Sequence, residues 1–286
     1  MDYQNPKLPE NNVSKEHPLK EFSTLLIGTL VLVIVISIGL TVAGSWLAGL
    51  IPYTAEKKVA SLYDVTPHSD NDKFPEIAAY LQQLADKISV AQNLPPEMKI
   101  TVHYMDSPTL NAFATLGGNV FMFRGLLEKL PNENTLVTLL GHEIAHIKYR
   151  HPIRSFGGGV SVAIAMTMIG SSADTSLLGD AGLLSTLQFS RKMESQSDLE
   201  AMNNLHAIYG HLNGGAQLFE IFREARGQFS GSETEQAKDN KTDKISGFFS
   251  THPQDETRIN SFSATAQEKG WTETGELTPL PDFFSF

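Results

Sequence analysis

The chain has 286 residues, 41% of them hydrophobic, and its 22 Lys and Arg against 32 Asp and Glu give a formal net charge of -10. This length suits one folded domain of ordinary size with an appendage. The acidic balance argues against a nucleic acid partner and gives no sign of a basic membrane-binding face. Because there is no cysteine, disulfides and Cys-based zinc sites are excluded, and any metal must be held by His and carboxylate groups.

The N-terminal part of the chain changes abruptly from polar to apolar. Residues 1–21 contain three prolines and little apolar content, which predicts a disordered tail. The 34 residues between Glu21 and Glu56 carry no charge, and about 20 apolar residues suffice to cross a bilayer. We therefore predict one transmembrane helix over residues 22–51. A cleaved signal peptide is the alternative, but the polar tail and the apolar run are both long for one.

The region that follows predicts a helix and then a small antiparallel sheet. Phe74-Pro75-Glu76 opens the helix, and residues 94–96 end it. Alternation over residues 98–105 predicts a strand, and a second strand over 111–116 turns at 117–119 to pair with 120–123. The helix is indicated by apolar residues at helical spacing, namely Ile77, Leu81, Leu84 and Ile88.

Helices dominate the predicted second half. A short helix covers residues 125–130, and a longer one begins after Pro131 with Asn132 or Asn134 as its cap. This longer helix carries regularly spaced apolar residues and should be mostly buried. Further helices are predicted over residues 188–210 and 216–222, and a flexible, polar loop over 230–244.

A second uncharged run extends from Ser155 to Ala173. Its dense apolar part, residues 160–170, is shorter than the roughly 20 residues that a membrane span needs. We therefore predict a buried or lid helix there, with a second membrane span as the alternative.

The longer helix contains the string His142-Glu143-Ile144-Ala145-His146. Helix positions four apart lie on one face, so the two imidazoles can bind one Zn²⁺ while Glu143 lies beside them, placed to take a proton from a zinc-bound water. Chance is the alternative, since two surface histidines four apart on a helix give the same short pattern.

A catalytic zinc ion needs a third protein ligand. The metzincin pattern would require Gly at position 149 and His at position 152, where this chain has Tyr149 and Pro152, so that class is excluded. Glu194 and Asp198 lie four apart on a predicted helix. Glu194 would bind the metal, and Asp198 would accept the free ring N–H of a ligand His. A solvated acidic pair is the alternative.

With these residues the chain resembles the gluzincin endopeptidases that include HtpX-type and CAAX prenyl proteases, and within them a single-pass, membrane-anchored bacterial member. The resemblance runs from about residue 75 to residue 265, with one departure at Ser197, where the family usually carries Ala. Three further segments carry it, namely Asn111–Ala114 with Gly117 and Gly118, Arg124–Leu127, and Ser250–Pro253 followed by Arg258 and Ile259.

The resemblance implies an α+β, mainly helical zincin-type metallopeptidase domain over residues 52–286, holding one zinc ion per chain. It further implies that His252 stabilises the oxygen that becomes negative, that Asn111 and Ala112 hold the substrate backbone, and that Arg258 pairs with Asp198 or orients the site. His252 as a helix-entry residue and Asn111 as a turn residue remain open.

Gly117 and Gly118 lack side chains, so another backbone can approach them, which suits a substrate peptide adding to the sheet edge. A tight hairpin turn explains them equally well. We assign no site role to the histidines that nothing pairs with a third ligand, namely His103, His151, His206 and His211.

These observations predict a membrane-anchored zinc endopeptidase that cleaves misfolded or misassembled polypeptides, with Glu143 as general base. The expected location is the cell membrane, with the catalytic domain on the extracytoplasmic, periplasmic side. Lysines on both sides of the span leave its orientation poorly determined. A zinc-binding, chaperone-like module of the same fold is the alternative. A CAAX prenyl-peptide processor is disfavoured because it normally lies within several membrane spans.

Overall fold

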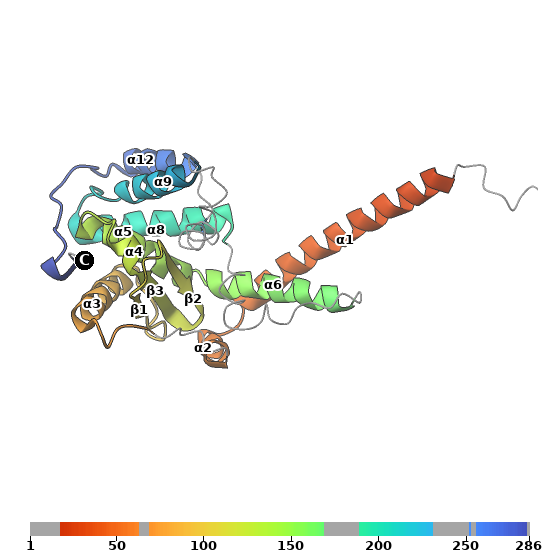
Figure 1. Ribbon diagram of the computed structural model, residues 1–286, viewed down its shortest axis with the longest axis horizontal. Coiled ribbons are helices and arrows are strands. Elements are labelled where there is room, and N and C mark those ends of the chain that lie inside the picture. The colour runs from red at the N-terminus through yellow and green to blue at the C-terminus, as the bar shows by residue number, and fades with distance from the viewer. Residues whose placement is uncertain (1–17, 63–68, 169–188, 231–251, 253–255, 285–286) are drawn as a thin grey trace, which may run out of the picture.

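A computed structural model of the protein describes residues 18–62, 69–168, 189–230, 252 and 256–284. Within these ranges the chain forms a mainly helical domain around one small sheet, with a long N-terminal helix that projects from it (Figure 1). This architecture confirms the predicted mainly helical α+β fold. The larger helices are α1 (Pro18–Gly49), α3 (Pro75–Ala91), α5 (Glu133–Lys148), α6 (His151–Met168), α8 (Arg191–Tyr209), α9 (Gln217–Ser230) and α12 (Glu256–Lys269).

Helix α1 is the predicted apolar helix. Within its segment Leu19–Gly49 a stretch of 18 residues reaches a mean hydropathy of 2.8, so the helix is long and apolar enough to cross a membrane, and it alone meets that test among the residues described. The helix begins at Pro18, four residues before the predicted boundary at 22. Proline is tolerated there because an N–H in the first turn of a helix has no acceptor within the helix. The rest of the predicted tail, residues 1–17, lies outside the described residues.

The buried or lid helix predicted over residues 160–170 overlaps the end of α6, which packs mainly along α1 (Figure 1), and its role as a lid stays a prediction. Small residues allow the close approach: a Cβ added at Gly157 would lie 2.7 Å from the carbonyl oxygen of Gly44. Ser45 Oγ donates a hydrogen bond to the carbonyl of Arg154 across the same contact, at 2.9 Å. The first part of the uncharged run is therefore a packing partner of α1, and residues 169–188 lie outside the described part.

A short helix that the sequence did not predict, α2 (Tyr53–Leu62), joins α1 to the domain. Its Glu56 is buried and accepts a hydrogen bond from Arg150 Nε, at 2.7 Å, just beyond the end of α5. The other carboxylate oxygen of Glu56 accepts from the backbone N–H of Gly117 at 3.1 Å. One buried carboxylate thus ties the segment after the apolar helix to both the end of α5 and the turn beside the sheet.

The sheet has three strands in the order β1 (Thr101–Met105), β3 (Asn119–Phe123), β2 (Ala112–Thr115). The predicted hairpin is present, because β2 and β3 pair antiparallel. The prediction of a wholly antiparallel sheet is wrong, since β1 pairs parallel to β3. The chain reverses direction between β1 and β2 and again between β2 and β3. Two reversals bring β3 back to the direction of β1, beside which it inserts.

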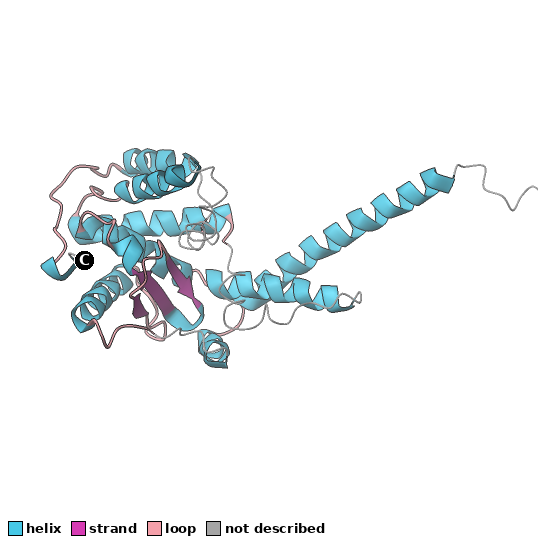
Figure 2. Cartoon of the chain, viewed as in Figure 1, coloured by secondary structure: helices cyan, strands magenta, loops and turns pink. Residues whose placement is uncertain are grey.

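Helix α5 lies in the core, as its apolar pattern predicted, and every residue from Asn134 to Ile147 is buried. Its cap is Asn132, whose side chain accepts a hydrogen bond from the Thr135 N–H at 2.9 Å. Helices α3 and α8 pack against α5, and the sheet lies beside them (Figure 2). The absence of a side chain at Gly141 lets α8 come close, since a Cβ there would lie 2.9 Å from Asn204 Nδ2.

The predicted helix over 188–210 is α8, which begins after the capping side chain of Ser190 and ends at Gly210. The one over 216–222 extends further, as α9, and the short helix expected over 125–130 is α4 (Arg124–Leu127). Apart from Ser230, which ends α9, the predicted loop over 230–244 lies outside the described residues.

Candidate metal centre and active site

Two histidines of α5 form the centre of the site. His142 and His146 lie one turn apart, as the motif predicted, and their Nε2 atoms are 3.0 Å from each other. Both side chains are buried, with exposed fractions of 3% and 0%. Their position in a core helix, and not on the surface, argues against the chance interpretation of the motif.

Glu194 on α8 faces both rings. Its Oε1 lies 3.5 Å from His146 Nε2, and its Oε2 lies 3.6 Å from His142 Nε2. The side chain is 1% exposed. The acidic pair predicted on this helix is therefore not a solvated surface pair, since α8 directs Glu194 into the core beside the two histidines.

His252 completes the group. Its Nδ1 lies 3.1 Å from Glu194 Oε1 and 3.5 Å from His142 Nε2. One ligand atom from each of four residues lies within 4.8 Å of all the others. The family resemblance implied that His252 stabilises a developing oxyanion, whereas the geometry also makes it a candidate fourth ligand. We call His142, His146, Glu194 and His252 the four-residue cluster.

Asp198, one turn after Glu194, holds the far side of His142. Its Oδ1 lies 3.0 Å from His142 Nδ1, the contact expected of a group that accepts the ring N–H. Burial lowers the pKa of His142, but the hydrogen bonds with Asp198 and Glu194 outweigh burial and raise that pKa to about 9. In the absence of a metal, the pair of rings therefore carries a proton at neutral pH.

Arg258 of α12, a helix that the sequence did not predict, neutralises the two carboxylates. Its Nε and Nη2 donate to Asp198 at 2.7 and 2.6 Å, and its Nη1 lies 2.9 Å from Glu194 Oε2. Burial alone would raise the pKa of Asp198, yet Arg258 and His142 hold that pKa below its ordinary value. Both carboxylates are thus available as anions inside the core.

The donor set fits a zinc ion. Ligands of a tetrahedral zinc site stand about 2.0–2.2 Å from the metal and therefore roughly 3.3–3.6 Å from one another. The corresponding separations in the four-residue cluster are 3.0 Å, 3.5 Å and 3.1 Å along the series His142, His146, Glu194, His252. Two imidazole nitrogens 3.0 Å apart need a proton or a metal ion between them, because two facing lone pairs would repel each other.

Glu143, the central residue of the motif, lies at the edge of the four-residue cluster. Its side chain is fully buried, and neither carboxylate oxygen has a hydrogen-bond partner among the residues described. Oε1 stands 3.6 Å from His252 Nε2. A buried carboxylate without hydrogen bonds is costly, so the fold keeps a proton acceptor here at some expense of stability.

The predicted substrate-binding residues lie along β2 and its turn. Asn111 is buried and its Oδ1 has no hydrogen-bond partner among the described residues. Ala112 begins β2, an edge strand whose four residues are all buried. Gly117 and Gly118 have φ of 79° and 91°, and added Cβ atoms would meet α2 and the backbone of Lys99. The turn therefore explains both glycines, and a substrate role for these residues stays a prediction.

Sequence reasoning missed two aromatic neighbours of the four-residue cluster. Phe189, just before α8, is buried, with its ring centroid 4.0 Å from that of His146. His151, the first residue of α6, was taken as an ordinary histidine, but its Nδ1 lies 3.0 Å from His146 Nδ1. His151 follows His146 by five residues across a helix break, so helical spacing gave no signal for the contact.

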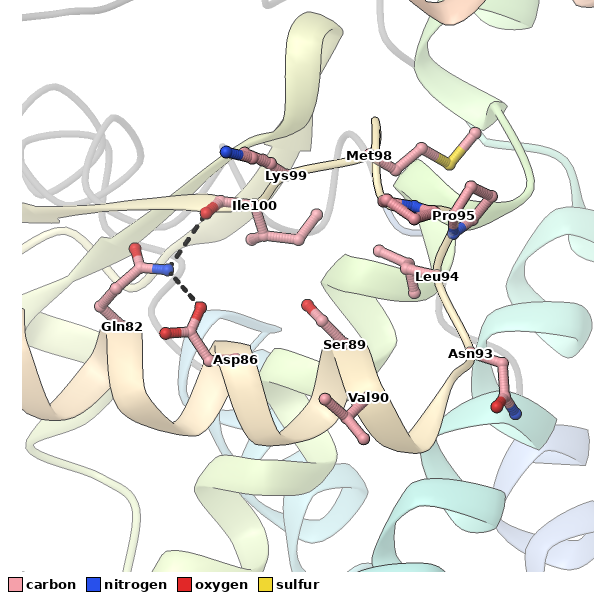
Figure 3. A pocket seen from close by; sticks show the side chains of 11 residues that line it. Gln82, Asp86, Ser89, Val90, Asn93, Leu94, Pro95, Met98, Lys99 and Ile100 are labelled. Carbon is pink, nitrogen blue, oxygen red and sulfur yellow. Dashed lines mark hydrogen bonds between the residues drawn. The ribbon is translucent and has the colours of Figure 1, made fainter.

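The pockets described do not reach the ligand atoms. The larger, of about 680 Å³, lies between α3 and the segment before β1, where Gln82 bonds to Asp86 and to the carbonyl of Ile100 (Figure 3). It shares no residue with the four-residue cluster. A smaller pocket, of about 180 Å³, is lined by Asp198 and Arg258. The four-residue cluster itself is closed off from solvent, with no member more than 3% exposed.

Comparison with known proteins agrees with the chemistry of the site. The chain is 30% identical over 185 residues to the "Mitochondrial metalloendopeptidase OMA1" of Schizosaccharomyces pombe, covering 63% of this chain and 50% of the relative. It is 27% identical over 181 residues to the "Metalloendopeptidase OMA1, mitochondrial" of Danio rerio, covering 59% and 36%. It is 30% identical over 125 residues to the "Beta-barrel assembly-enhancing protease" of Yersinia pestis, covering 40% and 24%. The chain spans half or less of the length of these relatives.

These relatives include mitochondrial and bacterial proteins and carry names other than HtpX or CAAX prenyl protease, so the finer resemblance and a bacterial origin remain predictions. The prediction of a metallopeptidase is confirmed at the level of the family. Peptidase family M48 matches residues 73–266, which include every predicted site residue. The chain therefore belongs to peptidase family M48.

Proposed function

We propose that the protein is a membrane-anchored, zinc-dependent endopeptidase. The observation that carries this proposal is the four-residue cluster with Glu143 beside it, in a chain of family M48. Three N or O ligands and an adjacent carboxylate are the residues that hydrolytic zinc sites use. A structural zinc site would have no use for a buried carboxylate that makes no hydrogen bond.

In this proposal His142, His146 and Glu194 hold the zinc. Bound zinc would polarise the substrate carbonyl and lower the pKa of a water from about 15.7 to roughly 7. Glu143 takes the proton of the attacking water on its free carboxylate oxygens and later delivers it to the leaving amine. General acid–base help of this kind contributes about 10²- to 10⁴-fold to the rate.

His252 and Asn111 act on the substrate. The imidazole of His252 lies between Glu194 and Glu143, so after leaving the cluster's ligand position it can donate to the carbonyl oxygen that gains negative charge. The unpartnered Oδ1 of Asn111 can accept a peptide N–H, with Ala112 in the adjoining edge strand. Asp198 and Arg258 keep His142 and Glu194 in position.

The expected substrates are misfolded or misassembled polypeptides close to a membrane. The apolar helix α1 supports anchoring, since most of its large apolar side chains are exposed and it spans more than the roughly 20 residues that a bilayer requires. A relative named for enhancing β-barrel assembly supports this substrate class. We place the catalytic domain on the extracytoplasmic side, with one membrane span per chain.

The proposal is tested on the full chain purified in detergent, by measuring bound zinc with elemental mass spectrometry and the cleavage of casein. We expect about one zinc per chain, loss of cleavage after chelation, and recovery when one equivalent of zinc is returned. Glu194→Gln should weaken zinc binding because a neutral amide replaces an anionic ligand. Zinc bound without any cleavage would contradict the proposal and favour the chaperone-like alternative.

A further inference from the structure

His151 has no part in the mechanism described above, although it touches the site. It begins α6, immediately after the turn that ends the active-site helix α5. Its side chain is fully buried. The Nδ1 atoms of His151 and His146 are 3.0 Å apart, which is hydrogen-bond distance. One of these two nitrogens must therefore carry a proton and the other must accept it.

The direction of this hydrogen bond follows from the position of the metal. The Nε2 atom of His146 faces His142 Nε2 and Glu194 Oε1, so it is the nitrogen that would bind zinc. A neutral imidazole that binds a metal through Nε2 has its proton on Nδ1. His146 Nδ1–H therefore donates to the lone pair on His151 Nδ1.

We infer that His151 is a positioning residue for the metal site, which fixes the tautomer and ring orientation of the ligand His146. The inference rests on the proposed zinc function. His151 does for His146 what Asp198 does for His142, whose Nδ1 lies 3.0 Å from Asp198 Oδ1. The two ligand histidines thus have different hydrogen-bond acceptors. His142 donates to Asp198, an anion that Arg258 neutralises, and His146 donates to the neutral ring of His151.

The surroundings of His151 keep its ring in one place. Its ring stacks on that of Tyr149 at 5.7 Å between centroids and lies 6.2 Å from the ring of Phe189. Phe189 also covers the His146 ring at 4.0 Å. Because these contacts come from both the residue before α8 and the α5–α6 turn, the acceptor nitrogen cannot turn away from His146 without disturbing the packing.

A pair of substitutions at position 151 tests the inference. His151→Leu keeps an apolar side chain of similar bulk but leaves His146 Nδ1–H without an acceptor. His151→Asn places an amide oxygen close to where Nδ1 stood. Loss of a group that orients a metal ligand typically weakens metal binding by about 10- to 100-fold. We expect that loss for His151→Leu, and zinc affinity within about threefold of wild type for His151→Asn.

The measurement is the zinc dissociation constant of the full chain, determined by competition with a chromogenic chelator at constant pH. His103→Leu is the matched control, because His103 is also buried but bonds to Asn119 in the sheet, so zinc affinity should not change. The thermal midpoint of each metal-free variant shows whether it is folded.

Two results would overturn the inference: wild-type zinc affinity in His151→Leu, or equal losses in the Leu and Asn variants. If the wild-type protein bound no zinc, the proposed function would be wrong, and this inference would be wrong with it. A folded His151→Leu variant with weakened zinc binding, rescued in His151→Asn, would establish the role.

Discussion

Arg258 is the arginine in contact with both Glu194 and Asp198, the two carboxylates that α8 brings to the site. It is 7% exposed, and its guanidinium lies 5.2 Å from the ring centroid of Phe219. Removing one partner of a buried ion pair leaves an uncompensated charge, which is far more costly than the net value of the pair itself. The stability of the metal-free protein should therefore depend strongly on this residue.

We predict that Arg258→Met destabilises the metal-free protein by about 3–5 kcal/mol at neutral pH, because two anions lose their counter-charge inside the core. Urea denaturation with a chelator present measures the change. Arg223→Met is a suitable control, since Arg223 is exposed on α9 and its loss should change stability by less than about 0.5 kcal/mol. Equal stabilities of the two variants would show that Arg258 does not neutralise the site.

Much of the site follows from residues that share a helix. Each pair of residues four positions apart shares one face of its helix. Helical periodicity alone therefore predicts the pair His142 and His146 and the pair Glu194 and Asp198. The contacts of Arg258, His252 and His151 depend instead on how separate elements pack. Spacing in the sequence does not predict how elements pack. Arg258 and His252 were assigned to the site only by resemblance to a family.

At the scale of elements, the contact between α1 and α6 depends on residues without side chains. The backbone of Gly44 meets α6 at Gly157, and Ser45 bonds to the carbonyl of Arg154. Gly159, two residues further along α6, has nothing within 4 Å of the position of an added Cβ. Helix α6 thus offers one glycine in close contact with α1, Gly157, and one without such a contact, Gly159, as a matched control.

Gly157→Leu should destabilise the packing of α6 on α1 by about 1–3 kcal/mol, the usual cost of forcing extra atoms into a filled contact. Gly159→Leu should be neutral or slightly stabilising, because leucine favours helix over glycine. Thermal unfolding of the full chain in detergent compares the two. If both variants unfold at the wild-type midpoint, the close helix contact does not exist in solution.

The elements that sequence predicted poorly share a physical reason. Helices α2 and α12 are polar on average and carry few large apolar residues, so their pattern is too weak to separate them from loops. The strand β1 was found from its alternation, but alternation does not identify its partner, and the parallel pairing with β3 was missed. Strong patterns such as α5 and the β2–β3 hairpin were predicted because local signals alone define them.

Over the whole molecule, the segment after the apolar helix α1 and the candidate site are joined by buried polar contacts. Glu56 of α2 holds Arg150, which follows the active-site helix, and it also holds the backbone of Gly117 beside the sheet. Arg150 adopts a φ of 60°, a conformation that few residues other than glycine take. This arrangement sets the domain directly after the apolar helix, so the proposed proteolytic site would lie near the membrane if α1 crosses it as proposed.

The central claim is that this fold holds zinc in order to cleave peptide bonds with Glu143 as the proton acceptor. Glu143→Gln removes the acceptor but none of the zinc ligands, so its effect separates catalysis from metal binding. We predict that the variant retains one zinc per chain and loses casein cleavage by at least about 10²-fold. A variant that keeps its zinc and cleaves casein as fast as wild type would contradict the account.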